Sequence, residues 1–137
     1  MNIENTNKEY HKNYHMVFSC QYHIIFCPKF RRPVLVDGID KRLKELVIQN
    51  ENKKNYKVIE MEVMPEHVHL LIDIDPKIGV YKTICFLKGL TSRKLREEFP
   101  VLRSRLPTLW TRSEFVSTVG CVSLEKVKQY IIDQKGI

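Results

Sequence analysis

The sequence of 137 residues predicts an α+β fold, in which helices pack against an antiparallel sheet. Short runs rich in β-branched and aromatic residues alternate with longer segments of helical periodicity. Prolines and glycines fall between these segments, where turns are expected. The length fits a single domain spanning residues 1–137, because two independent hydrophobic cores would need a longer chain.

The first elements are a polar segment, a strand and a helix. Residues 1–13 are polar, and we expect them to be flexible. The run MVFSCQYHIIF, residues 16–26, predicts one long strand. Residues 40–52 then predict a helix with Asp37 or Asp40 as its N-cap. The positions that define the helical spacing are Leu43, Leu46, Val47 and Asn50.

A hairpin and a long helix follow. The runs YKVIEMEVM, residues 56–64, and VHLLIDI, residues 68–74, read as strands on either side of a turn at Pro65. Residues 78–99 have helical periodicity, and Pro100 is expected to end this helix.

The chain closes with a fourth strand and a last helix. We expect the strand over residues 109–119, after a loop, and the helix over residues 123–134 with Ser123 as its N-cap. The order strand, helix, strand, strand, helix, strand, helix is the split βαβ pattern of ferredoxin-like folds, with one added C-terminal helix. In that fold the strand of residues 68–74 lies inside the sheet beside the first strand.

Composition restricts the function only loosely. Lysine and arginine total 23 against 16 acidic residues, a net charge of +7 that favours a polyanionic partner. No CxxC pair and no apolar stretch of about 18 residues occurs, which argues against a zinc ribbon, a disulfide framework or a membrane span. We therefore expect a cytoplasmic protein. The cysteines are Cys20, Cys27, Cys85 and Cys121.

Two histidines in MPEHVHLLI form the clearest chemical motif. Residues two apart in a strand face the same side, so His67 and His69 present their imidazoles together while Val68 faces the other side. Two neutral imidazoles directed at one point can form half of a divalent-metal site. The alternative is that both histidines simply lie on a partly covered sheet face.

A second motif lies in KVKQYIIDQ near the C-terminus. Tyr130 and Gln134 are one helical turn apart and therefore share a face. A tyrosine hydroxyl can attack a phosphodiester, and an amide oxygen can complete a metal site. The alternative is a core tyrosine beside a solvated glutamine, as in most amphipathic helices.

Two basic segments are candidate DNA-binding surfaces. One surrounds Phe30 in CPKFRRPVL, and the other lies in LKGLTSRKLREEFP. Arginine can bind phosphate through two hydrogen bonds and can stack on bases, although such charges also serve solubility. The candidate residues are Lys29, Arg31, Arg32, Lys88, Arg93 and Lys94.

Together these segments resemble the HUH-type single-tyrosine transposases of the smallest bacterial insertion sequences. The similar stretches are CPKFRRPVL, MPEHVHLLI, LKGLTSRKLREEFP, LWTRSEFVSTVG and YIIDQ, in that order and at similar spacing. The resemblance covers residues 15–134.

This resemblance implies a DNA strand-transfer enzyme. In it, His67, His69 and Gln134 would be the metal ligands and Tyr130 the nucleophile that forms a 5′-phosphotyrosine. The mixture of imidazole and amide ligands suits Mg²⁺ or Mn²⁺. The resemblance also implies a homodimer whose active sites are shared between subunits, acting on single-stranded DNA with hairpin ends.

The residues leave two points open. No general base for the tyrosine is evident, because strand alternation is expected to direct Glu66 to the face opposite His67. A non-catalytic ferredoxin-like nucleic-acid-binding module is an alternative function, although the strands lack the aromatic pattern of RNA-recognition motifs. A domesticated relative acting on chromosomal palindromes is another.

Overall fold

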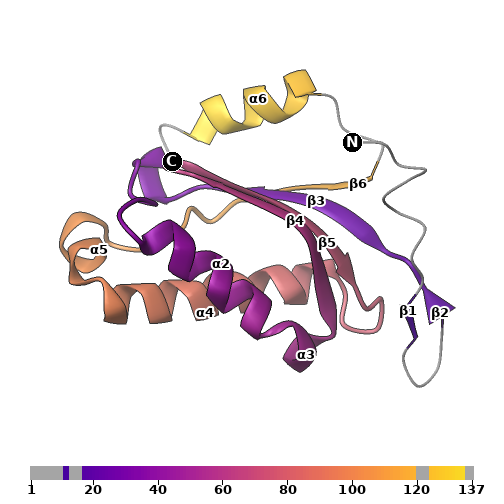
Figure 1. The fold of residues 1–137 in the computed structure, drawn as a ribbon. Helices are drawn as coiled ribbons and strands as arrows, with labels where there is room; N and C mark the ends of the chain where they lie inside the picture. Colours follow the sequence, from indigo (N-terminus) through magenta and orange to yellow (C-terminus); the bar gives the residue numbers. More distant parts are fainter. Residues whose placement is uncertain (1–10, 13–16, 120–123, 135–137) are drawn as a thin grey trace.

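A computed structural model describes residues 11–12, 17–119 and 124–134 of the chain. Its main feature is a four-stranded antiparallel sheet, and two shorter strands pair beside it (Figure 1). In chain order the elements are β1 (His11–Lys12), β2 (Val17–Phe18), β3 (Gln21–Phe26), η1 (Lys29–Arg31), α2 (Ile39–Gln49), α3 (Glu51–Lys54), β4 (Tyr56–Met64), β5 (His67–Ile74), α4 (Val80–Glu98), α5 (Pro100–Arg105), β6 (Phe115–Thr118) and α6 (Leu124–Asp133).

The strand order confirms the predicted ferredoxin-like fold. The sheet runs β4-β5-β3-β6, and every neighbouring pair is antiparallel. Strand β5, which carries His67 and His69, is therefore an inner strand beside β3, as expected. An inner strand is hydrogen-bonded on both edges, so it holds its side chains in fixed positions.

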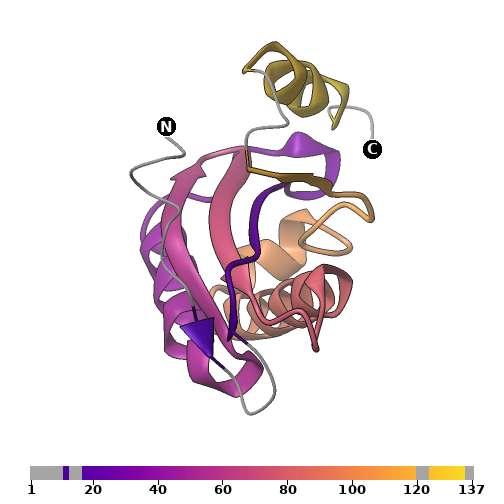
Figure 2. The same ribbon diagram turned by 90° about the vertical axis from the view of Figure 1, so that its right-hand side faces the viewer.

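The core fills the space between the sheet and helices α2 and α4, which cover one face (Figures 1 and 2). Helix α6 lies on the opposite side of the sheet (Figure 1). Every second residue of the inner strands faces the core, in agreement with the alternation of a pleated sheet. The buried strand residues of this cluster include Ile24, Phe26, Val68, Leu70 and Ile72.

Trp110 fixes the segment before β6 against the core. Its ring packs edge-on against Phe26, with ring centroids 4.7 Å apart. Its Nε1 donates a hydrogen bond of 3.0 Å to the buried hydroxyl of Thr91 in α4.

We expect Thr91→Val to lower the free energy of unfolding by about 1–3 kcal/mol, because the buried indole N–H loses its acceptor. Thr91→Ser retains the hydroxyl and should lose less. Urea denaturation of both variants measures the difference. Equal stabilities of the two variants would show that the hydrogen bond contributes little.

The expected long first strand is broken at Ser19 and Cys20. The backbone N–H of Cys20 donates to the carboxylate of Asp73, at 3.0 Å, and so does not join a strand ladder. The segment 1–13 was expected to be flexible, but His11–Lys12 forms β1 and pairs with β2. The rest of that segment lies outside the described residues.

The expected N-caps of the first helix are wrong. Helix α2 begins after Gly38, whose φ of 95° suits glycine, and no side chain caps it. Asp37 has a φ of 54° and Asp40 lies inside the first turn, so neither can take the cap position. The predicted helical face is confirmed, since Leu43, Leu46, Val47 and Asn50 are all buried.

Two further boundaries differ from the expectation. Pro100 ends α4 but also starts α5, because proline is well tolerated in the first turn of a helix. The fourth strand is shorter than predicted and covers only Phe115–Thr118. The proposed cap Ser123 lies outside the described residues. Among the helices that the structure describes, none is both long and apolar enough to cross a membrane.

Candidate active site

The histidine pair lies on the sheet face that α2 and α4 leave uncovered. Val68, which lies between the two histidines in the sequence, is fully buried in the core, so His67 and His69 face the other side of the sheet. Cross-strand pairing places Ile25 of β3 and Glu62 of β4 beside His69 on this outer face. Helix α6 lies on the same side (Figure 1). The prediction that both imidazoles share a face is confirmed.

His67 is held by the residue that precedes it. Its Nδ1 lies 2.8 Å from Oε1 of Glu66, and its side chain is only 16% exposed. The expectation that Glu66 faces away from His67 is wrong. Glu66 lies in the turn between β4 and β5, where strand alternation does not apply.

His69 contacts a histidine that lies outside the HVH motif. Its Nε2 lies 3.1 Å from Nδ1 of His23 in β3, with ring centroids 5.3 Å apart. Burial is the largest cause that lowers the pKa of each ring, so both are neutral at neutral pH. Only the pairing register of β3 with β5 brings His23 to this position, and no local pattern reveals it.

Tyr130 and Gln134 converge on one hydroxyl group. Ser113 donates to Oε1 of Gln134 at 3.0 Å, and its oxygen lies 3.5 Å from the phenol oxygen of Tyr130. The ring of Phe115 packs against the ring of Tyr130, with the ring centroids 5.4 Å apart. Gln134 is 3% exposed, so its amide is not simply solvated. The predicted shared face of Tyr130 and Gln134 is confirmed, and Ser113 is an addition that spacing could not reveal.

The environment of Tyr130 favours the neutral phenol. Burial raises the pKa of Tyr130 to about 12, and the hydrogen bond with Ser113 partly opposes this. Negative charge on Cys27 or Glu114 would raise the pKa further. A chemical role as nucleophile therefore requires that the proton be removed during the reaction.

Cys27 is an electrostatic neighbour of both parts of the site. It is fully buried at the end of β3, and burial raises the pKa of its thiol to about 11. The nearby carboxylate of Glu66 adds to the rise in the pKa of this thiol, and a thiolate at Cys27 would raise the pKa of Tyr130. Among the described residues, however, no hydrogen bond joins Tyr130 or Gln134 to either histidine of β5.

The donor atoms fit a divalent cation. Nδ1 of His67 is engaged by Glu66, so Nε2 of His67 is available to bind a metal ion. One nitrogen of His69 contacts His23, so the other nitrogen of His69 is available in the same way. Oε1 of Gln134 accepts one hydrogen bond and has a second lone pair. Within the described ranges no three His, Cys, Asp or Glu side chains are grouped to hold a metal, so an amide or water oxygen would be needed.

The first basic segment, which contains the short helix η1, forms a partly exposed turn beside α6 and is called the basic loop below. Phe30 and Arg31 adopt positive φ angles of 59° and 50°, and the Phe30 ring is 43% exposed with the Lys29 ammonium 5.2 Å from its centre. Arg31 donates to the backbone oxygen of Ile131 in α6 at 3.3 Å. Arg32 is exposed. Helix α6, which carries Tyr130, is therefore in contact with the basic side chains of this segment.

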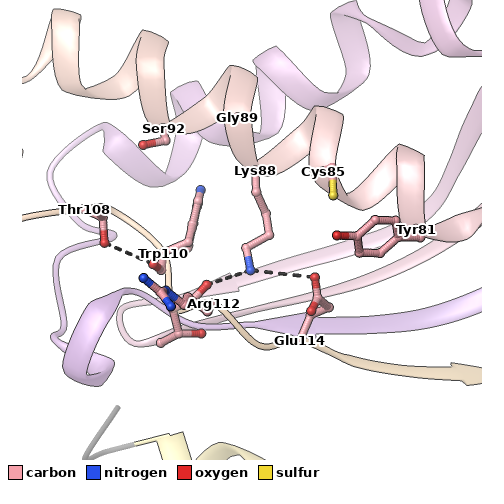
Figure 3. Close-up of a pocket in the computed structure, with 10 residues that line it drawn as sticks. Tyr81, Cys85, Lys88, Gly89, Ser92, Thr108, Trp110, Arg112 and Glu114 are labelled. Atoms are coloured by element: carbon pink, nitrogen blue, oxygen red, sulfur yellow. Dashed lines mark hydrogen bonds and ion pairs between the residues drawn. The ribbon is translucent and has the colours of Figure 1, made fainter.

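Lys88 has structural contacts that the sequence did not indicate. Its ammonium donates to the backbone oxygens of Thr111 and Ser113, at 2.7 and 3.4 Å. It also lies 3.8 Å from Glu114 (Figure 3). Burial lowers its pKa. Lys88 therefore anchors the loop that presents Ser113 to Tyr130. Farther along α4, Arg93 is exposed and Lys94 is partly buried.

A shallow groove of about 400 Å³ lies between α4 and this loop. Figure 3 shows Lys88 and Tyr81 extending from α4 toward the loop, and Arg112 of the loop also lines the groove. Tyr81 is 72% exposed. An aromatic ring beside cations is the combination that binds single-stranded nucleic acid in other proteins.

We expect Lys88→Ala to lower the free energy of unfolding by about 1.5–3 kcal/mol, because the charged hydrogen bonds to the backbone oxygens of Thr111 and Ser113 are lost. Lys82→Ala is the matched control, because Lys82 lies on the same helix and is exposed. Thermal or urea denaturation measures both. If Lys88→Ala were no less stable than Lys82→Ala, Lys88 would not be an anchor of the loop.

Comparison with known proteins identifies related sequences over most of the chain. The sequence model of a family described as "Transposase IS200 like" matches residues 16–134. The ISDra2 transposase TnpA of Deinococcus radiodurans is 33% identical over 120 residues, which cover 86% of each chain. The transposase for insertion sequence element IS200 of Salmonella typhimurium is 32% identical over 122 residues, covering 88% of this chain and 80% of the relative.

Solved structures agree with these sequence matches. A putative transposase from Deinococcus radiodurans superposes with a TM-score of 0.82 at 30% identity, covering 93% of this chain and 99% of the other. A REP-associated tyrosine transposase bound to a REP hairpin superposes with a TM-score of 0.52 at 12% identity, covering 88% and 67% of the two chains. The second likeness concerns the fold alone.

Proposed function

Because the chain belongs to the IS200-like transposase family, we propose that it cuts and rejoins single-stranded DNA through a tyrosine ester on Tyr130. The observation that carries this proposal is the convergence of Tyr130 and Gln134 on Ser113. Helix α6, which carries Tyr130 and Gln134, lies on the side of the sheet that His67 and His69 face. The proposed nucleophile and the three proposed metal ligands therefore lie on one side of the sheet.

The proposed reaction exchanges one phosphate ester for another. The phenol of Tyr130 gives its proton to water, its oxygen attacks the scissile phosphorus in line, and the bond from phosphorus to the 3′ oxygen breaks. The 3′ oxygen takes up a proton and leaves as a hydroxyl, while the 5′ phosphate stays on the tyrosine. Rejoining reverses these steps with a different 3′-OH, and needs no ATP because the two esters have similar energies.

His67, His69 and Gln134 would hold Mg²⁺ or Mn²⁺. Such an ion, when bound, offsets negative charge on the phosphate during the attack. The chain's own contribution is to orient the donors, since Glu66 and Ser113 hold the side chains of His67 and Gln134. Both contacts leave a donor lone pair for the ion.

The raised pKa of Tyr130 predicts a pH-dependent rate. Below its pKa of about 12 the phenolate fraction rises tenfold per pH unit, so we expect the single-turnover rate of adduct formation to rise with pH between about 7 and 9. Rapid quenching at saturating Mn²⁺ measures this. A rate independent of pH over this range would mean that the phenol is already deprotonated in the complex.

The proposed DNA contacts lie on two surfaces. The basic loop with Lys29, Arg31 and Arg32 adjoins the tyrosine helix, and Arg93 and Lys94 extend along α4. The net charge of +7 favours binding of a phosphate backbone. We propose that terminal hairpins of the element bind here, while Lys88 acts through the loop that it anchors.

We also propose that two copies form a homodimer with shared sites. The described part of one chain shows no hydrogen bond between the tyrosine helix and the histidine pair, so its contacts do not by themselves join the two halves of the proposed site. Mixing Tyr130→Phe with His67→Ala tests this. If sites are shared, mixed dimers contain one site with an intact tyrosine and intact histidines, and cleavage is restored. Two inactive proteins that stay inactive after mixing would favour sites within one chain.

The proposal as a whole is tested with end-labelled hairpin DNA and Mn²⁺ on a denaturing gel. A 3′-labelled strand should migrate with the protein, because the 5′ phosphate of the downstream fragment is attached to it. A 5′-labelled strand should be released as a shorter fragment with a free 3′-OH. Hairpin binding without either product would favour a non-catalytic binding module.

A further inference from the structure

Each histidine of β5 has a separate polar partner outside the proposed ligand set. Glu66 contacts His67, and His23 contacts His69. We propose that Glu66 and His23 are positioning residues that fix the orientation and the tautomer of the two ligating imidazoles. This inference rests on the proposed function and extends it by two residues.

Glu66 determines which nitrogen of His67 is available. An ionised carboxylate can only accept hydrogen bonds, so the 2.8 Å contact places the proton on Nδ1 of His67. The lone pair is then on Nε2. A carboxylate behind a histidine ligand is a common arrangement in metal sites, where it fixes the ring and raises its basicity.

His23 determines the tautomer of His69. Of the two nitrogens 3.1 Å apart, one donates and one accepts. If His23 donated to Nε2 of neutral His69, the proton of His69 would be on Nδ1 and no lone pair would face an ion. A ligating His69 must therefore donate from Nε2 to Nδ1 of His23, which leaves Nδ1 of His69 open.

We infer that His23 supports the ring of His69 through their hydrogen bond and is not itself a third metal ligand. Its backbone pairs with Leu71 on one side and Ser117 on the other, so it lies two residues along β3 from Ile25, the residue that pairs with His69. His23, His67 and His69 do not form a three-residue metal group in the described part of the chain. Strand pairing on both edges fixes the ring of His23 against that of His69.

The first test needs no metal and no DNA. ¹⁵N NMR of the imidazoles in the metal-free protein should show the Nδ1–H tautomer for His67 and the Nε2–H tautomer for His69. Glu66→Ala should change the signals of His67 alone, and His23→Ala those of His69 alone. The opposite tautomers in the wild-type protein would overturn the inference.

The second test measures Mn²⁺ affinity by electron paramagnetic resonance. We expect Glu66→Ala and His23→Ala each to weaken Mn²⁺ binding by about 10–100-fold. Glu66→Asp and His23→Gln retain an acceptor and should recover part of the affinity. Glu62→Ala is the control for charge alone, because it removes a carboxylate that pairs with His69 from β4 but is not hydrogen-bonded to either histidine in the described structure.

His67→Ala separates the two levels of the proposal. If it leaves Mn²⁺ affinity unchanged, the proposed metal site fails. If it abolishes Mn²⁺ binding while Glu66→Ala and His23→Ala bind as tightly as wild type, the positioning roles fail and the metal site stands. Thermal unfolding of each variant verifies the fold, and the wild-type NMR result stays decisive even if one variant does not fold.

Discussion

Tyr130→Phe is expected to reduce the covalent protein–DNA adduct below detection. The substitution removes the only oxygen of that side chain, and phenylalanine offers no atom that could attack phosphorus. The ring itself should stay in place, because its packing against Phe115 is unchanged. The lost contact with Ser113 is a long one of 3.5 Å, so the cost in unfolding free energy should be less than about 1.5 kcal/mol.

The matched control for Tyr130→Phe is Tyr22→Phe, since Tyr22 is a partly buried tyrosine packed against the core. It should form the adduct at the wild-type rate. Hairpin affinity, measured by fluorescence anisotropy, should be similar for both variants and wild type. An adduct of normal yield with Tyr130→Phe would show that another residue is the nucleophile.

His67→Ala is expected to slow strand cleavage by about 10³-fold or more. A metal ion contributes several kcal/mol of transition-state stabilisation, and each 1.36 kcal/mol corresponds to a factor of ten in rate. The fold should tolerate the change, because the side chain lies outside the core on the outer face and its hydrogen bond goes to the adjacent Glu66. Single-turnover cleavage at increasing Mn²⁺ concentration measures the loss.

Met64→Ala is the matched control for His67→Ala, because Met64 pairs with His67 across the strands and is 46% exposed. It should cleave normally. Hairpin binding should be retained by both variants, since the basic loop does not involve either residue. Loss of binding together with cleavage would assign His67 a structural role and would contradict the metal site.

Local sequence patterns were sufficient for most of the elements. The runs YKVIEMEVM and VHLLIDI match β4 and β5 to within one residue, and the helical spacing of α2 and α4 is confirmed. Errors occurred at boundaries, where a single backbone conformation decides. Gly38 starts α2 in place of a capping aspartate, and the Cys20 N–H turns to the Asp73 carboxylate and so interrupts the first strand.

The sequence by itself determined which side chains share a face. The period of a strand unites His67 with His69, and the period of a helix unites Tyr130 with Gln134, because each depends only on neighbouring residues. Only the tertiary structure decided the partners, with His23 beside His69 and Ser113 beside Tyr130. These contacts join residues 46 and 17 positions apart. They depend on strand register and on packing between elements, which no local period encodes.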